Sequence, residues 1–336
     1  MNHFNWNKLL IRAAVFFISV FVLSVFVFWL SRLAPGDPLV SYYGDRVEKM
    51  TTEERDRAED RLGLNQPVAR QYVIWAGNAL HGDFGISYKY KQQVTTVIEQ
   101  RMANTLILGG IGFVLTFALS LLLGLLCARY EDSALDRFIQ HLGTVTASVP
   151  EFWFSLILIL IFSVTLKLLP SSGAWSVGSG GSSIIDRMVH LILPMTVLVL
   201  SHLWYYAYMI RNMLLEEIRE DYVLMARAKG LTRSQILFRH CLRNIMPAFI
   251  SLMAISVPHI LGGTFIIETV FSYPGIGTLA YESARYHDYN LLMLICMITG
   301  VVVIFCNILG QAVAERIDPR MKDQEQTELS EVEDVN

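Results

Sequence analysis

The chain has 336 residues, of which 53% are hydrophobic and only 17% are charged, and its formal net charge is −3. Soluble domains carry about 25% charged residues, so the excess of apolar residues indicates a membrane protein. The small negative charge argues against a surface that binds polyanions such as nucleic acid. The four cysteines lack metal-type or secreted-type spacing, so they are expected to pack as small apolar side chains, with no metal site.

Six apolar runs are long enough to cross about 30 Å of hydrocarbon as helices. The first is too long for the apolar segment of a signal peptide and no small-residue cleavage site follows it, so we interpret it as a retained span. The third is overlong and is broken at Ser148-Val149-Pro150-Glu151, so its beginning is expected to be a separate cytoplasmic or interfacial piece. The six runs lie near residues 9–31, 104–128, 137–168, 188–212, 247–270 and 290–314.

Lys and Arg residues in the tails and short loops predict the orientation. Basic residues gather before the first run, after the second run, between the fourth and fifth runs and after the last run. The loops 169–187 and 271–289 carry one Arg each. Both termini and the basic segment between the fourth and fifth runs are therefore expected in the cytoplasm.

The chain is expected to form an all-α, polytopic membrane protein in four parts. The first part contains the N-terminal tail and the first span, and the second is a sizeable extracytoplasmic insert. The insert is expected to hold a capped helix that ends at Gly63 and an amphipathic helix over 66–80. Residues 171–183 are predicted to form a flexible external loop. The four parts are 1–33, the insert 34–103, the spanning core 104–314 with a cytoplasmic loop at 213–246, and a cytoplasmic tail 315–336 whose end is expected to be disordered.

The sequence contains no motif that predicts catalysis. It has no phosphate-binding G-x-x-x-x-G-K-[ST], no H-E-x-x-H and no G-x-S-x-G, so we expect no enzyme activity and no cofactor in this chain. Ionisable residues inside spans are costly in lipid and are candidates for a translocation path. Those residues are His202, His259 and Glu268, with Glu151 beside the break in the third run. The alternative role for the histidines is a hydrogen bond between helices.

The basic segment EDYVLMARAKGLTRSQILFRHCLRNIMP, residues 220–247, predicts two short helices that meet at a corner. The first is expected over 215–229, with Ile218, Tyr222, Met225 and Lys229 on one face and Gly230 as its stop. A capping box at Thr232-Arg233-Ser234-Gln235 would open the second, and Pro247 would start the next span. The pattern fits either an interfacial helix pair bound to lipid phosphates or a docking element for a cytoplasmic partner.

Several motifs in this chain resemble those of one transporter family. Y-V-L-M-A-R-A-K-G-L at 222–231 and H-C-L-R-N-I-M-P at 240–247 resemble the EAA loop of ABC importer permeases, in its dipeptide/oligopeptide/nickel branch. Leu224-Met225-Ala226 stand where E-A-A would. Further similar motifs occur in order, and the resemblance covers nearly the whole chain. They are S-R-L-A-P-G-D-P at 31–38, L-G-L-N-Q-P-V-A-R-Q-Y at 62–72, G-D-F-G-I-S at 82–87, V-P-E-F-W at 149–153, E-T-V-F-S-Y-P-G-I-G at 268–277 and D-P-R at 318–320.

The resemblance implies a type I ABC importer permease fold and the first subunit of a heterodimeric permease pair in a bacterial inner membrane. It implies a second permease, two ATPases that bind ATP and Mg²⁺, a substrate-binding protein and surrounding membrane lipid as partners. The cargo would be peptides, nickel or another metal chelate. The alternative is a stand-alone channel or secondary transporter. The ATPase-coupling residues implied are Tyr222, Ala226, Ala228, Gly230, Leu231, Arg239, Arg243 and Pro247.

Overall fold

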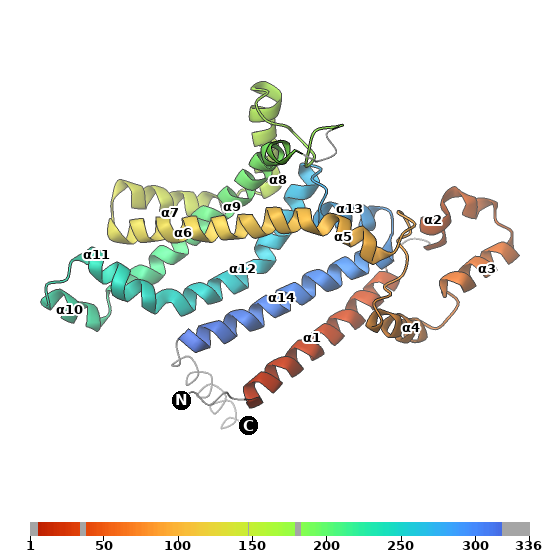
Figure 1. Ribbon diagram of the computed structural model, residues 1–336, viewed down its shortest axis with the longest axis horizontal. Coiled ribbons are helices and arrows are strands. Elements are labelled where there is room, and N and C mark those ends of the chain that lie inside the picture. Colours follow the sequence, from red (N-terminus) through yellow and green to blue (C-terminus); the bar gives the residue numbers. More distant parts are fainter. Residues whose placement is uncertain (1–5, 34–37, 147, 179–182, 318–336) are drawn as a thin grey trace. The chain divides into compact units, whose positions relative to one another are not determined.

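The computed structural model describes residues 6–33, 38–146, 148–178 and 183–317, and no strand occurs within these ranges (Figure 1). The tail beyond residue 317, with D-P-R, and residues 179–182 of the Gly/Ser loop lie outside the described residues. The α-helices are α1 Trp6–Leu33, α2 Pro38–Tyr43, α3 Thr52–Leu62, α4 Val68–Leu80, α5 Val94–Thr105, α6 Ile111–Arg129, α7 Ala134–Thr146, α8 Glu151–Leu158, α9 Ile184–Ile218, α10 Asp221–Ala228, α11 Arg233–Ile236, α12 Leu242–Val270, α13 Ile276–Arg285 and α14 Tyr289–Ile317. A 3₁₀ helix covers Gly44–Lys49, and π-helical turns cover Leu106–Gly110, Ile159–Thr165 and Leu237–Cys241.

Five described helical stretches are long and apolar enough to cross a membrane, which agrees with five of the six predicted spans. The sixth consists of α7 and the helix Glu151–Thr165, which together pass the same test but are bent by 107°. The break expected at 148–151 is therefore present, with Pro150 directly before the first residue of α8. The five stretches are Leu10–Leu33, Val94–Arg129, Ile184–Ile218, Arg233–Val270 and Tyr289–Arg316.

The chain divides into two compact units. Unit 1 contains Met1–Thr105 and Ser272–Phe305, and unit 2 contains Leu106–Phe271 and Cys306–Asn336. The predicted insert thus lies wholly in unit 1, together with the segment that contains α13.

In unit 1, capping residues close in sequence determine where a helix of the insert begins and ends. Thr51 and Glu54 form a reciprocal capping box at the start of α3, and Gly63 ends it with φ +68°. Both features agree with the prediction. The predicted amphipathic helix is also present as α4. It packs against α1, where the buried Phe28 ring lies 5.4 Å from the Tyr72 ring.

A polar network joins the segment after α4 to α13 and α14. The Ser87 hydroxyl donates to the buried Asp288 carboxylate at 2.5 Å. Lys89 Nζ lies 2.7 Å from Glu282 Oε2, and the Tyr90 hydroxyl donates to the same oxygen at 2.5 Å. These contacts span about 200 positions of sequence, so they fold two distant stretches of unit 1 into one body.

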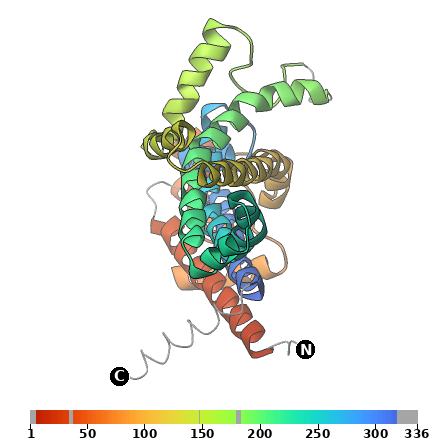
Figure 2. The same ribbon diagram turned by 90° about the vertical axis from the view of Figure 1, so that its left-hand side faces the viewer.

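In unit 2, α6, α7 and α9 lie side by side (Figures 1 and 2). Glycines allow these helices to approach closely: a Cβ at Gly112 would lie 2.4 Å from Leu198 Cδ2, and one at Gly143 would lie 3.0 Å from the Trp204 carbonyl oxygen. Cys127 is buried beside Ile139, as expected for an apolar cysteine.

A buried ion pair links α7 to α9. Arg211 donates from Nε and a terminal nitrogen to the two carboxylate oxygens of Asp136, at 2.6 and 2.7 Å. Asp136 has no exposed surface. Such two-point pairs fix geometry as well as charge, so Arg211 holds the end of α9 that leads to α10.

Candidate functional site

A tight corner separates α10 from α11. Gly230 has φ +83°, in the left-handed region that glycine enters without strain. Its N–H donates to the Arg227 carbonyl at 2.9 Å, and the Leu231 N–H donates to the Ala226 carbonyl at 3.3 Å. This pair of hydrogen bonds is a Schellman C-cap. The prediction that Gly230 stops the first helix is confirmed.

The second helix begins at the predicted capping box. The Thr232 hydroxyl accepts from the Gln235 N–H at 3.4 Å, and the Gln235 side chain accepts from the Thr232 N–H at 2.9 Å. Helical structure then continues through the π-helical turn Leu237–Cys241 and α12 to Val270. The prediction that Pro247 starts a new span is therefore wrong: Pro247 is buried inside α12. Prolines are tolerated inside packed membrane helices because neighbouring groups satisfy the freed carbonyl.

The prediction of one continuous helix over 215–229 is also wrong, because this segment contains the end of α9 and the separate helix α10. The chain breaks after Ile218, because Glu220 has extended backbone angles before α10. The break changes the face that α10 buries. Val223 and Ala226 are buried. Ile218 and Met225, predicted on one face, differ in exposure, since Ile218 is buried and Met225 is 64% exposed.

Tyr222 connects α10 to the helices on both sides. Its hydroxyl donates to Glu217 at 2.7 Å and contacts Cys241 Sγ at 3.5 Å, and Asn244 Nδ2 donates to the same Glu217 oxygen at 2.8 Å. Burial, with these hydrogen bonds, raises the pKa of Tyr222, so the phenol stays a hydrogen-bond donor. The network holds α10, α9 and α12 together around the corner.

Glu131, in the connection between α6 and α7, also holds the corner. Arg233 donates to Glu131 at 2.6 Å and to the Ala128 carbonyl at 2.8 Å. Arg219 lies 3.6 Å from Glu131. Sequence reasoning missed this contact because the partners are about 100 positions apart.

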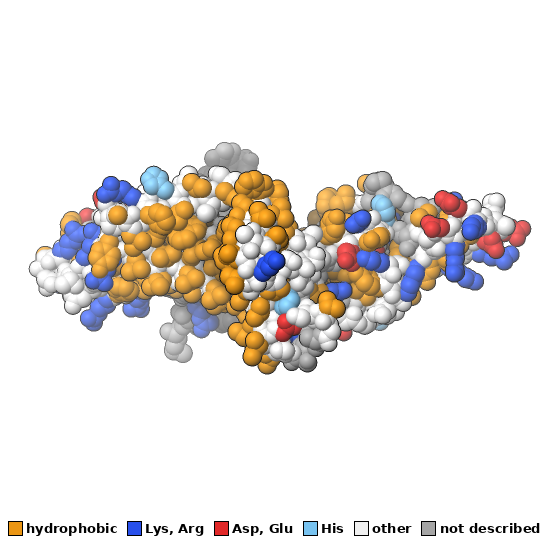
Figure 3. Space-filling view, turned by 90° about the horizontal axis from the view of Figure 1, so that it is seen from above, with side chains coloured by type: hydrophobic (Ala, Val, Ile, Leu, Met, Phe, Trp, Pro, Cys, Tyr) orange, Lys and Arg blue, Asp and Glu red, His pale blue; other side chains and the backbone are white. Residues whose placement is uncertain are grey.

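The corner presents a mixed apolar and basic surface. Figure 3 shows Lys and Arg side chains gathered at the left of the view, where Figure 1 places α10 and α11, next to apolar side chains. We call the following exposed residues the corner surface: Leu224, Met225, Arg227, Lys229, Phe238, Arg239 and Arg243. Of the eight predicted coupling residues, Ala226 and Pro247 are buried, Tyr222 and Leu231 are half-buried, and Ala228, Gly230, Arg239 and Arg243 are exposed.

A cavity of about 350 Å³ in unit 2 brings together His202 from α9 and His259 from α12. Glu151, from the start of α8, lines it as well. His202 Nε2 lies 3.4 Å from Glu151 Oε1, and His202 Nδ1 lies 3.0 Å from the Leu198 carbonyl oxygen. Both histidines expected to line a path thus share one cavity.

Glu151 has an unusual setting in this cavity. Its Oε2 is buried and has no hydrogen-bond partner among the described residues. Its carboxylate packs against Gly263, where a Cβ would lie 2.5 Å from Oε1. The third predicted path residue, Glu268, is fully buried and does not line the cavity.

The amino-acid sequence matches two family descriptions that together cover most of the chain. Residues 120–323 match the binding-protein-dependent transport system inner membrane component, and residues 6–109 match the N-terminal part of a binding-protein-dependent transport system membrane component.

Individual relatives match nearly end to end. The oligopeptide transport system permease protein AppB of Bacillus subtilis (strain 168) is 32% identical over 93% of this chain and 98% of its own length. A protein of Brucella suis biovar 1 (strain 1330) named as a peptide permease is 34% identical over 89% of this chain and 94% of its own length.

The fold also has a relative among solved structures. A chain of the inward-facing MetNI methionine ABC transporter superposes with a TM-score of 0.54 at 16% identity, over 66% of this chain and 97% of that one. At this identity the likeness concerns the fold alone, which is that of a type I importer permease.

Proposed function

Because the chain belongs to the family of binding-protein-dependent transport system inner membrane components, we propose that it is the first permease subunit of an importer that carries peptides. Membership makes it a multi-pass inner-membrane component of an ABC importer, without catalytic activity of its own. The near full-length likeness to permeases named for oligopeptides and peptides carries the cargo proposal. Neither of these relatives is named for nickel.

The cargo proposal is tested by transport. The chain, its second permease, the two ATPases and the binding protein are reconstituted in proteoliposomes, and uptake of a labelled tetrapeptide is compared with uptake of a Ni²⁺–histidine complex. We expect uptake of the peptide that requires both ATP and the binding protein. Uptake of the nickel complex alone would contradict the proposal.

We assign ATPase coupling to the corner. The corner surface combines apolar anchors with a basic rim, which suits a helix pair that fills a groove on a cytoplasmic protein. The Schellman cap, the capping box and the Glu131 and Tyr222 contacts hold that pair rigid. A groove that moves when two ATPases close on ATP and Mg²⁺ would then displace α12. Docking shifts the conformation only where contacts differ between states.

The remaining partners follow from this assignment. A second, dissimilar permease would complete the path, a substrate-binding protein would deliver cargo outside, and lipid would surround the spans. The basic tails and corner would face the cytoplasm. His202, His259 and Glu151 would line the path through their shared cavity. Ionisable groups inside spans are energetically costly, and where they occur they usually mark a substrate or ion pathway. Glu268 does not line this cavity, so any contact it makes with the path would be at another point along it.

A stand-alone channel or secondary transporter is not favoured, because the matched relatives are permeases of transport systems. It would transport without ATPases and would respond to an ion gradient. Proteoliposomes with an imposed proton gradient and no ATP test this directly.

A further inference from the structure

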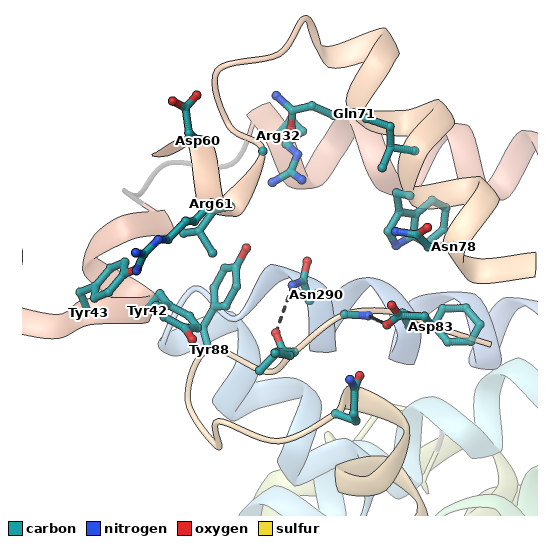
Figure 4. Close-up of a pocket in the computed structure, with 18 residues that line it drawn as sticks. Arg32, Tyr42, Tyr43, Asp60, Arg61, Gln71, Asn78, Asp83, Tyr88 and Asn290 are labelled. Atoms are coloured by element: carbon teal, nitrogen blue, oxygen red, sulfur yellow. Dashed lines mark hydrogen bonds between the residues drawn. The ribbon is translucent and has the colours of Figure 1, made fainter. Parts of the chain in front are cut away.

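Unit 1 contains a cavity of about 590 Å³ (Figure 4). It is formed by the last turn of α1, by the ends of α2 and α3, by α4, by the segment before α5 and by the start of α14. Pockets for small ligands usually measure about 300–1,000 Å³. Most of its lining residues belong to the predicted insert, and all of them belong to unit 1, whereas the corner and the cavity around His202 belong to unit 2.

Three polar atoms around this cavity are buried without a hydrogen-bond partner among the described residues. They are Arg32 Nε, Gln71 Oε1 and Trp75 Nε1, and they make up half of the six such side-chain atoms in the described part of the chain. The Gln71 amide nitrogen donates to two backbone carbonyls, at 2.8 and 3.2 Å, which fixes the orientation of its oxygen. Buried polar groups are nearly always paired, so this concentration indicates a ligand that supplies two acceptors and one donor.

The charges around the cavity have both signs. Figure 4 shows the Arg32 guanidinium and the Tyr88 hydroxyl turned toward the same central space, with Asp83 on another side of it. The Phe28 ring, 5.0 Å from Arg32 Cζ, holds the guanidinium in place. Burial raises the pKa of Tyr88, and the neighbouring Arg32, hydrogen-bonded to it, acts in the opposite direction. Tyr88 therefore stays neutral and able to donate to an anion.

The lining also matches the polar groups of a peptide. Gln71, Asn78 and Asn290 bring side-chain amides, which complement backbone N–H and C=O groups, and aromatic rings form part of the wall. The lining carries two arginines, Arg32 and Arg61, and two carboxylates, Asp60 and Asp83, so its charges balance and do not favour a group of concentrated negative charge such as phosphate. A zwitterion with separated ends suits this arrangement better.

We propose that this cavity binds the C-terminal end of a cargo peptide, with its carboxylate on Arg32 and Trp75 Nε1 and a backbone N–H on Gln71 Oε1. The inference rests on the proposed function as a peptide permease. Arg32 lies in the last turn of the first span, so a peptide held there would stand at the boundary between the insert and the membrane, before it enters the path.

The test measures binding to the full-length chain in phosphatidylcholine nanodiscs by calorimetry, without ATPases. The probes are trialanine and trialanine amide, which differ only in the terminal carboxylate. We expect trialanine to bind about 10- to 100-fold more tightly than its amide, the usual range for a hydrogen bond to a charged group. Arg32→Gln should abolish this preference. Arg70→Gln, at an exposed arginine on α4 outside the lining, should retain it.

A second variant keeps the proposal testable if Arg32→Gln fails to fold. Trp75→Phe retains the ring and removes one N–H, so it should weaken trialanine binding by about threefold to tenfold. Equal binding of acid and amide to the wild type, or a preference that survives Arg32→Gln, would overturn the proposal. Trialanine binding that is present in phosphatidylcholine and lost in phosphatidylglycerol nanodiscs would show instead that an anionic lipid headgroup is the occupant of Arg32.

Failure of this inference is distinguishable from failure of the proposed function. If the importer takes up peptides with ATP and the Arg32→Gln importer does so equally well, the cavity assignment is wrong and the peptide function stands. If the wild-type importer takes up no peptide, the proposed function itself is wrong.

Discussion

The Glu151 carboxylate lies against the backbone of Gly263, so closely that a Cβ at Gly263 would be 2.5 Å from Oε1 and 2.6 Å from Oε2. The adjacent Gly262 has open space, with nothing within 4 Å of the same position. Gly263 therefore leaves room for a carboxylate that reaches His202.

We expect Gly263→Ala to displace the Glu151 carboxylate from His202. The side chain can rotate away, so the protein should still fold. The 3.4 Å contact between Glu151 Oε1 and His202 Nε2 would be lost, so peptide uptake should fall several-fold if the path needs this pair. Uptake by proteoliposomes checks this, with Gly262→Ala as the matched control. Equal activity of the two variants would mean that Glu151 has no part in transport.

We expect Gly230→Val to uncouple ATP hydrolysis from transport. Left-handed backbone costs a residue with a Cβ about 1–2 kcal/mol, while open space around Gly230 removes any steric effect. The corner should lose its fixed angle, and more ATP should be hydrolysed for each peptide taken up. Gly230→Asn is the control, because asparagine tolerates this conformation. An unchanged ratio in the valine variant would exclude a coupling role for the corner.

We expect Arg239→Glu with Arg243→Glu to weaken binding of the ATPases. Both side chains are exposed on the corner surface, and reversal of their charge replaces attraction by repulsion at a complementary groove. The measurement is the amount of ATPase that co-purifies with the tagged chain. Arg55→Glu with Arg57→Glu, on α3, makes the same change of charge elsewhere. Unchanged assembly would favour lipid phosphates as the partners of the corner arginines.

We expect the Glu282–Lys89 contact to stabilise unit 1 only above acidic pH. Burial acts to raise the pKa of Glu282, but hydrogen bonds from Lys89 and Tyr90, with nearby positive charges, outweigh it and lower the pKa from its ordinary value of 4.5. Because the folded-state pKa is depressed, the stabilisation is present above about 4.5 and is lost as pH falls through the folded-state value.

Glu282→Gln should therefore lower the unfolding temperature at pH 7, and the difference from wild type should shrink as pH falls below about 4.5. Thermal unfolding in detergent between pH 3 and 7 measures this difference. Glu48→Gln, at an exposed position of the insert, is the control. A difference that is constant across this range would show that the ionised form of Glu282 contributes nothing.

Much of the fold could be predicted because its signals are local. Five spans follow from continuous apolar runs, and the broken sixth follows from Pro150 and its polar neighbours. The corner follows from two helix caps, at Gly230 and Thr232. The hydrogen bonds of both caps join residues that lie within five positions of each other. Such hydrogen bonds depend on nearby sequence, so pattern alone identifies them.

The rest depends on contacts that sequence spacing does not encode. Glu131 meets Arg233 only when α6 and α11 have packed, and Asp136 meets Arg211 across 75 positions. The break after Ile218 was missed because helical periodicity continues through it. Which face of α10 is buried then depends on its angle to α9, so the predicted common face of Ile218 and Met225 does not persist across the break.

The helical stretch from Arg233 to Val270 has a mechanical consequence. It carries the cap of the corner at one end and His259 about 39 Å further along, at 1.5 Å per residue. The π-helical turn at Leu237–Cys241 and the prolines Pro247 and Pro258 are points where this stretch can bend, so a push on Arg233 would arrive at His259 as a combination of translation and bending. His202 lies on a different helix, which ends at Ile218. Sliding of one helix past the other would therefore change the separation of the two histidines. The width of the cavity between them would then depend on the position of the corner.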